Sequence, residues 1–160
     1  MKKANFLVKL ASEGKLQIIE PNTDITGAYV QKSGKSLSSA KALLELGNLE
    51  DSVALSYYAM YHCLLAILFR VGIKCENHAA SIILLKSVFG IDNQEIFKAK
   101  ADRVDKQYYV DFAISKKETS ESIAVSEEFI ANLADFIARI TEEDVKRFRE
   151  TAIALIQPTK

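Results

Sequence analysis

The sequence predicts an all-α protein, an up-and-down bundle of five or six helices. Its 160 residues include only two prolines and six glycines, whereas sandwiches and barrels need many turns built from these residues. Apolar residues make up 49% of the chain and recur at the three- and four-residue spacing of helices. Because the length suits one ordinary domain, we expect residues 1–160 to form a single domain.

The few glycines, prolines and capping residues mark where helices begin and end. The expected helices span residues 2–13, 23–46, 78–89, 92–107 and 120–140, and a further helix has Glu50 and Asp51 in its first turn and is closed by Gly72. Gly47 leaves a connection so short that the two helices it joins must be antiparallel neighbours. Residues 73–77 read as a polar loop, and Thr141 either starts a new helix or lies within one that continues to Leu155. The expected core is residues 23–140, with helix 2–13 before it and an extension over 141–157.

The segment from Val53 to Phe69 is apolar on nearly all sides. The segment is 17 residues long, includes the polar residues Ser56 and His62 and is flanked by charged residues. A membrane span, by contrast, needs about 20 predominantly apolar residues. We therefore expect the central helix of a bundle or a dimer-facing helix, and no membrane association. At the N-terminus Lys9 interrupts any signal-like apolar run, so a cytoplasmic protein is expected.

The charge balance excludes a general nucleic-acid-binding surface, because 21 basic and 21 acidic residues give a formal net charge of zero. Any nucleic-acid role must rest on a local patch. The two cysteines form no disulfide framework. His62 and Cys63 point about 100° apart on a helix and cannot readily face one ion. We therefore expect no metal site and no cofactor.

Two consecutive stretches carry a family resemblance. Residues 40–52 read AKALLELGNLEDS and residues 56–62 read SYYAMYH. This pattern, a helical hairpin followed by a central helix with a YYA-M-[FY] signature, resembles the HEPN domain, and the resemblance covers about residues 23–140. Three further features fit: His78 opening a helix after a glycine-containing loop, Arg103 shortly before Tyr108-Tyr109, and Asp111-Phe112 beyond them.

The resemblance implies a helical bundle that dimerises through the helices bearing the polar signature residues. It also implies partnership with a minimal nucleotidyltransferase, as toxin and antitoxin, in many members. Active toxins of the family are metal-independent ribonucleases with an Arg-x(4–6)-His motif, often continued by x-Tyr. Here Arg70 and His78 are separated by seven residues, and Ala80 occupies the place of the tyrosine.

Three hypotheses follow from the residues and the resemblance together. In the first, the protein is a homodimeric module that binds nucleotide or RNA, pairs with a minimal nucleotidyltransferase and has no strong catalysis. Its expected binding residues are Tyr58, His62, Arg103 and Tyr109, with Arg103 beside His78, Tyr58 and His62. In the second, it is a metal-independent endoribonuclease toxin that uses Arg70 and His78 as catalytic residues. In the third, it is a non-enzymatic protein–protein scaffold.

Overall fold

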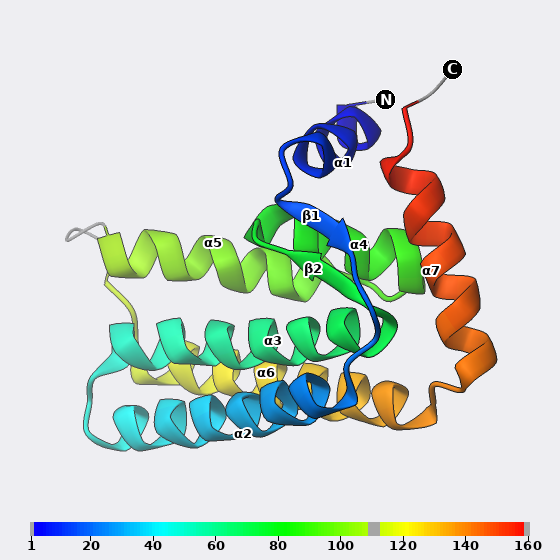
Figure 1. Ribbon diagram of the computed structural model, residues 1–160. Coiled ribbons are helices and arrows are strands. Elements are labelled where there is room, and N and C mark those ends of the chain that lie inside the picture. Colours follow the sequence, from blue (N-terminus) through cyan, green and yellow to red (C-terminus); the bar gives the residue numbers. More distant parts are fainter. Residues whose placement is uncertain (1, 109–112, 159–160) are drawn as a thin grey trace.

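The prediction of an all-α bundle is confirmed by the computed structural model (Figure 1), which describes residues 2–108 and 113–158, apart from the side chains of residues 2, 4 and 105–108. In chain order the elements are α1 (Lys2–Ser12), β1 (Leu16–Ile18), α2 (Thr23–Glu45), α3 (Leu49–Val71), β2 (Ile73–Cys75), α4 (His78–Phe89), α5 (Gln94–Tyr108), α6 (Lys116–Arg139) and α7 (Glu142–Ile156). The described part of the chain thus holds seven helices instead of the predicted five or six.

Helix α3 is the centre of the bundle, with α2, α5 and α6 packed around it (Figure 1). It is long and apolar enough to span a membrane, but 72% of its most apolar window is buried inside the protein. Other helices therefore cover the surface that lipid would contact in a spanning helix. This burial agrees with the predicted role of α3 as a central bundle helix.

Small residues let α2 and α3 pack closely as an antiparallel pair. The buried positions of α2 are Thr26, Ser33 and Ala40, which recur every seven residues and so form one narrow stripe. Ser33 donates a hydrogen bond of 2.6 Å to the carbonyl of Ala59 in α3. Ser52 of α3 donates in return to the carbonyl of Ala40, at 2.7 Å. These contacts fix which face of α3 is left for the other helices.

The prediction of a polar loop over residues 73–77 is wrong. Residues Ile73–Cys75 form β2, which pairs antiparallel with β1 so that Leu16 faces Cys75 and Ile18 faces Ile73. Leu16 and Ile73 are both almost completely buried. The segment is extended because its partner strand, more than fifty residues earlier, supplies its backbone hydrogen bonds, and no local pattern reveals such a partner.

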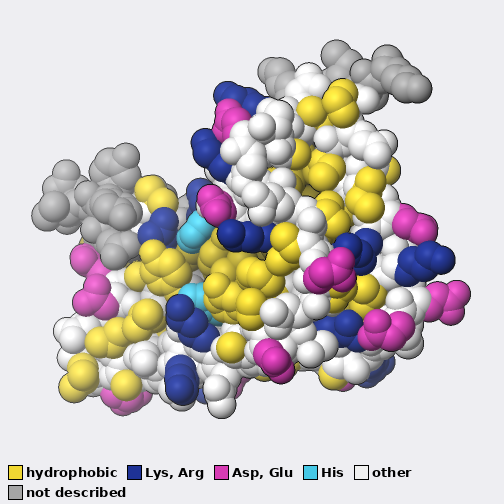
Figure 2. All heavy atoms as spheres, in the orientation of Figure 1, with side chains coloured by type: hydrophobic (Ala, Val, Ile, Leu, Met, Phe, Trp, Pro, Cys, Tyr) yellow, Lys and Arg dark blue, Asp and Glu magenta, His cyan; other side chains and the backbone are white. Residues whose placement is uncertain are grey.

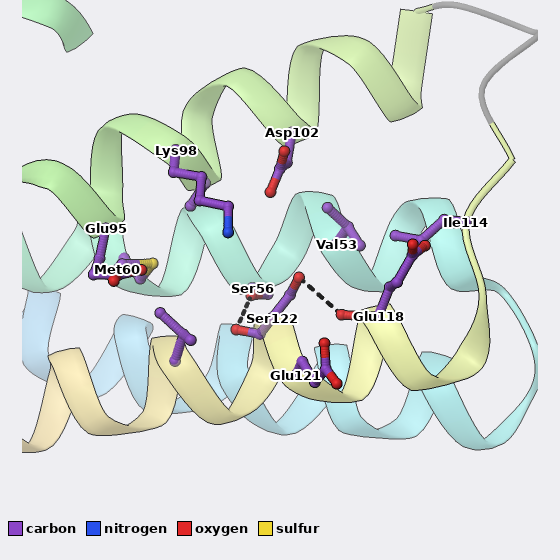
Figure 3. A pocket seen from close by; sticks show the side chains of 12 residues that line it. Val53, Ser56, Met60, Glu95, Lys98, Asp102, Ile114, Glu118, Glu121 and Ser122 are labelled. Atoms are coloured by element: carbon purple, nitrogen blue, oxygen red, sulfur yellow. Dashed lines mark hydrogen bonds between the residues drawn. The ribbon is translucent and has the colours of Figure 1, made fainter.

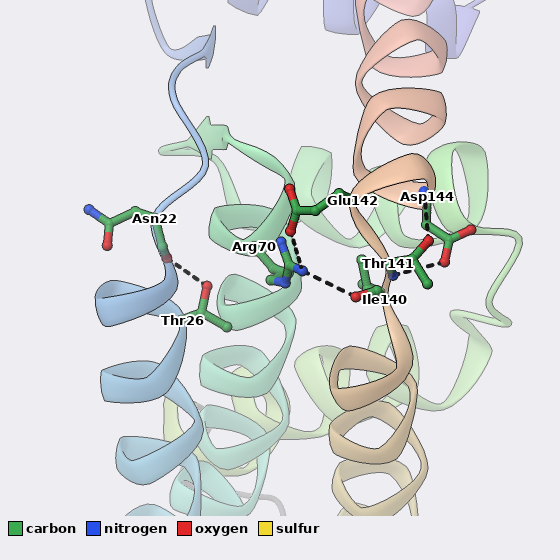
Figure 4. Close-up of polar contacts among 7 residues, drawn as sticks. All are labelled: Asn22, Thr26, Arg70, Ile140, Thr141, Glu142 and Asp144. Carbon is green, nitrogen blue, oxygen red and sulfur yellow. Dashed lines mark hydrogen bonds and ion pairs between the residues drawn. The ribbon is translucent and has the colours of Figure 1, made fainter.

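Two capping boxes determine where the last two helices, α6 and α7, begin. Helix α6 starts at Lys116 and not at Ser120, because Ser115 and Glu118 exchange side-chain and backbone hydrogen bonds in front of it. The same arrangement joins Thr141 to Asp144 (Figure 4), so α7 is a new helix and not a continuation of α6. Helix α7 consequently leaves the direction of α6 and stands across the end of the bundle (Figure 1).

Candidate functional site

Four ring-bearing residues of α3 form the base of the candidate site. Tyr57 and Tyr61 lie one turn apart on the inward face, and they are 0% and 6% exposed. Tyr58 and His62 follow them on the adjoining, half-buried face. The rings of each pair stack, with centroids 6.0 Å apart for the tyrosines and 6.2 Å apart for Tyr58 and His62. The predicted shared face of Tyr58 and His62 is therefore present, next to a buried tyrosine pair.

Arg103 of α5 brings a positive charge onto these rings. Its Nη1 donates a hydrogen bond of 3.0 Å to the hydroxyl of Tyr58. The guanidinium carbon lies 5.3 Å from the ring centroid of Tyr57 and 5.4 Å from that of Tyr58, within the range of cation–π attraction. Among the residues that the structure describes, Arg103 forms no ion pair, and its buried Nε has no hydrogen-bond partner.

His78 reaches the same rings from the start of α4. Asn77 caps this helix by accepting a hydrogen bond of 2.9 Å from the backbone N–H of Ala80. The imidazole stacks on Tyr61 with centroids 3.9 Å apart and planes 17° apart. Its Nδ1 lies 2.8 Å from the hydroxyl of Tyr57. The first turn of α4 therefore positions His78 beside Arg103 and next to the positive end of a helix dipole.

The electrostatics of the site favour an anion. Burial lowers the pKa of His78 below its ordinary value, and the positive charges of Arg103 and Lys100 lower it further. Burial also raises the pKa of Tyr61 to about 12 and that of Tyr57 higher still. At neutral pH the imidazole and both phenols are therefore neutral, and among the described residues the charges that act on His78 are those of Arg103 and Lys100.

His62 extends the ring cluster toward α2. Its Nδ1 lies 3.3 Å from the hydroxyl of Ser36, and its ring stacks on Tyr29, which stacks in turn on Phe69. Burial lowers the pKa of His62 to about 4, with a smaller contribution from the charge of Lys32. The space-filling view shows an apolar area on this face of the molecule, with both histidines of the chain beside it (Figure 2).

The low pKa of His62 should make the protein less stable in mild acid. Unfolded His62 titrates near 6.5 and folded His62 near 4, so below pH 6.5 the unfolded chain binds a proton that the folded chain does not. The contribution that this difference in pKa makes to the free energy of unfolding is complete above pH 6.5 and is lost as the pH falls toward 4. With allowance for partial exposure, we expect a loss of about 1 kcal/mol between pH 7.5 and 5.0 from this residue.

Urea unfolding at these two pH values, for the wild type and for His62→Gln, measures this contribution. Glutamine cannot titrate but can still bond to Ser36. The variant should therefore lose about 1 kcal/mol less than the wild type on acidification. Equal losses in the two proteins would show that His62 has an ordinary pKa in the folded state.

Arg70 lies far from His78 within one protomer. Its Nη2 donates to the carbonyl of Ile140 and to the Glu142 carboxylate, both at 3.1 Å (Figure 4). His78 contacts α3 at Tyr57 and Tyr61, and Arg70 lies thirteen and nine residues beyond them, which is roughly 20 Å and 13 Å along a helix axis. The structure therefore does not bring Arg70 and His78 together as a cooperative pair within a protomer.

The structure brings the other predicted site residues together, except for one that lies outside the described part of the chain. Tyr58, His62, Arg103 and His78 lie in one cluster, whereas Tyr109 falls among residues 109–112, which are not described. The sequence reasoning missed Tyr57 and Lys100. A signal for Tyr57 was present, because it is the first tyrosine of the YYA signature. Only the packing of α4 on α3, however, shows that the hydroxyl of Tyr57 faces a histidine.

A cleft on the other flank of α5 has the opposite charge. It has a volume of about 360 Å³, lies between α5 and α6 over α3 (Figure 3), and includes Lys98 and four carboxylates, those of Glu95, Asp102, Glu118 and Glu121. Neighbouring residues on a helix point about 100° apart, so Asp102 faces this cleft while Arg103 faces the ring cluster. An anionic ligand is therefore favoured at the ring cluster and disfavoured in the cleft.

Comparison with known proteins places the chain in a family. The model of the HEPN domain matches residues 27–160, which is most of the chain. A relative, the UPF0332 protein PH1297 of Pyrococcus horikoshii, is 39% identical over 54 residues. That match covers 34% of this chain and only 38% of the relative. On the extent of the family match, together with the helical bundle and the signature residues on its central helix, this chain is a member of the HEPN domain family.

Proposed function

We propose that this protein binds the phosphate of a nucleotide or of RNA at the cluster of Tyr58, His78 and Arg103. The observation that carries the proposal is the environment of the Arg103 side chain. Arg103 is half-buried as a residue, and its guanidinium lies over two tyrosine rings and has no ion pair with any carboxylate of the described residues. A cation in such surroundings attracts an external anion more strongly than a solvated cation does, because the local dielectric constant is low.

The neighbouring groups supply what a phosphate ligand needs besides charge. Among the described residues, Arg103 uses one terminal nitrogen for Tyr58 and has no hydrogen-bond partner for the other, which can then donate to a phosphate oxygen. Lys100 adds a second positive charge, and α4 begins at His78, so the positive end of its dipole lies next to this residue. The half-buried rings of Tyr58 and His62 offer a stacking surface for a base.

We further propose that the protein works as a homodimer in the cytoplasm and pairs with a minimal nucleotidyltransferase, as in toxin–antitoxin systems. The net charge of zero gives no long-range attraction for RNA, so a second chain beside the site would help to retain a ligand. The half-buried apolar side chains around His62, including Tyr29 and Phe69, support association on this face.

A ribonuclease reaction through Arg70 and His78 has less support than binding. A general acid or base and the group that stabilises the phosphate must reach the same scissile bond. Arg70 is instead engaged with the junction of α6 and α7. We therefore expect binding without strong catalysis, and expression in a bacterial host should cause no growth arrest that His78→Ala relieves.

Titration of the wild-type protein and of Arg103→Gln with ATP and with a short single-stranded RNA tests the proposed site. Glutamine keeps a hydrogen-bond donor near Tyr58 but removes the charge. The variant should bind between about tenfold and one hundredfold more weakly, which is the range for loss of one charge-assisted hydrogen bond. The matched control is Arg139→Gln, an exposed arginine of α6 paired with Asp135, and its affinity should change less than twofold.

Two results would contradict the proposal. If the wild type binds neither ATP nor RNA, the protein–protein scaffold is the better account of the molecule. If Arg103→Gln binds as tightly as the wild type, a ligand site exists but lies elsewhere. Light scattering of the free protein, measured alongside, should give twice the mass of one chain if the proposed homodimer forms.

A further inference from the structure

We infer that Tyr57 is a positioning residue of the proposed phosphate site. Its hydroxyl donates a hydrogen bond to Nδ1 of His78 and thereby keeps the ring proton on Nε2, the nitrogen that points away from Tyr57. His78 then presents an N–H donor to the ligand. The inference rests on the function proposed above, because the ligand that receives this hydrogen bond is the proposed phosphate.

The direction of the hydrogen bond follows from the burial of Tyr57. The side chain is completely buried, and its hydroxyl lies 2.8 Å from Nδ1 of His78. Burial raises the pKa of this phenol, so the hydroxyl keeps its proton at every physiological pH. A buried hydroxyl proton needs an acceptor, and the acceptor within reach among the described residues is Nδ1. In a neutral imidazole with an unprotonated Nδ1, the proton is on Nε2.

The surroundings keep His78 neutral and in one orientation. Partial burial opposes a second proton on the ring, and so do the charges of Arg103 and Lys100 of α5. The ring of Tyr61 lies 3.9 Å below the imidazole and nearly parallel to it. A flip of the imidazole would lose the hydrogen bond to Tyr57. The ring is therefore held by one contact in its plane, from Tyr57, and by one across its face, from Tyr61.

The tautomer decides whether His78 attracts or repels a phosphate. With the proton on Nε2, the imidazole donates a hydrogen bond to a phosphate oxygen beside Arg103. With the proton on Nδ1, a nitrogen lone pair faces the negatively charged oxygen instead, which is unfavourable. Tyr57 thus affects the ligand through His78 while remaining too deeply buried to touch the ligand itself.

The test compares Tyr57→Phe with Tyr61→Phe. Both changes remove one phenol hydroxyl next to the same imidazole, but the hydroxyl of Tyr61 lies 3.4 Å from Ser81 and makes no bond to His78. Nitrogen-15 NMR of the free protein reports which nitrogen of His78 carries the proton. The chain has only two histidines, so the His78→Gln spectrum assigns the signals. ATP affinity is measured on the same samples, and circular dichroism verifies that each variant is folded.

We expect the Nε2–H tautomer in the wild type and in Tyr61→Phe, and a mixture of tautomers in Tyr57→Phe. ATP should bind about fivefold to tenfold more weakly to Tyr57→Phe, as expected for one hydrogen bond, whereas Arg139→Gln, the control outside the site, should change the affinity less than twofold. A wild-type spectrum with the proton on Nδ1 would overturn the inference even if no variant folds. An unchanged tautomer in folded Tyr57→Phe would also overturn it.

The two readouts separate this inference from the proposed function. The tautomer is measured without ligand, so it tests the hydrogen bond from Tyr57 alone. If the tautomers change as expected but the wild type binds no ATP and no RNA, the effect of Tyr57 on His78 is supported while the proposed phosphate site is rejected. If ATP binds and Tyr57→Phe changes the tautomer without changing the affinity, the phosphate site is retained and the positioning role is rejected.

Discussion

Replacing Gly72 with alanine should lower the free energy of unfolding by about 3 to 5 kcal/mol. Gly72 ends α3 in the left-handed region, with a φ of 77°, where an L side chain is strained. A Cβ at this position would also overlap Nη1 of Arg149 and the carbonyl oxygen of Ile19. The carbonyl belongs to the backbone and cannot move aside as a flexible side chain can. Urea unfolding of the purified variant measures the loss.

Gly47→Ala separates the two causes of that loss. Gly47 has nearly the same φ, 78°, but no atom lies within 4 Å of the position that a Cβ would occupy. Its replacement should lower the free energy of unfolding by about 1 to 2 kcal/mol, the strain of the left-handed conformation alone. Equal losses in the two variants would mean that the close approach of Arg149 and Ile19 to Gly72 contributes nothing.

The helices could be predicted from sequence because their boundaries depend on local signals. Gly47 and Gly90 end helices in the structure where the sequence places them, and Asn77 caps α4. The small sheet could not be predicted in this way, because Ile73 becomes extended only through its pairing with Ile18. The early start of α6 was missed although the signal, Ser115 followed by Glu118, is present in the sequence.

The candidate site was predictable in part. Tyr58 and His62 share a helix face by spacing alone, and the family resemblance drew attention to His78 and Arg103. Which arginine joins His78 could not be read from spacing: Arg70 is closer in sequence, but it lies on the same helix as Tyr57, well beyond the contact with His78. The packing of α4 and α5 on α3 brings in Arg103 instead. Such choices depend on how helices pack against each other, which a single sequence does not encode in a local pattern.

The two arginines at the far end of α3 from the proposed site act on the fold. Arg149 of α7 donates from Nη1 to the carbonyls of Ile19 at 2.6 Å and Val71 at 2.9 Å. It therefore connects α7 to the chain entering α2 and to the last turn of α3. Arg70 makes a lesser connection, because its partner carboxylate on Glu142 is largely exposed to solvent.

Arg149→Met should lower the free energy of unfolding by about 2 to 4 kcal/mol, because the partly buried carbonyls of Ile19, Val71 and Gly72 lose a charged donor. Methionine keeps most of the apolar length of the side chain. Arg70→Met should lower it by about 1 kcal/mol, and Arg147→Met, which breaks only an exposed pair with Asp144, by less than about 0.5 kcal/mol. Urea unfolding measures all three variants under one condition.

The ATP affinity of these variants decides whether this end of α3 takes part in binding. Arg149→Met and Arg70→Met should bind ATP as the wild type does at a temperature where they remain folded, whereas Arg103→Gln should not. If Arg70→Met instead loses affinity as strongly as Arg103→Gln, Arg70 must reach the ligand. Since Arg70 lies roughly 13 to 20 Å along α3 from Tyr61 and Tyr57, the two contacts of His78, within one chain, it would then have to come from a second copy, and the ligand would lie between two protomers.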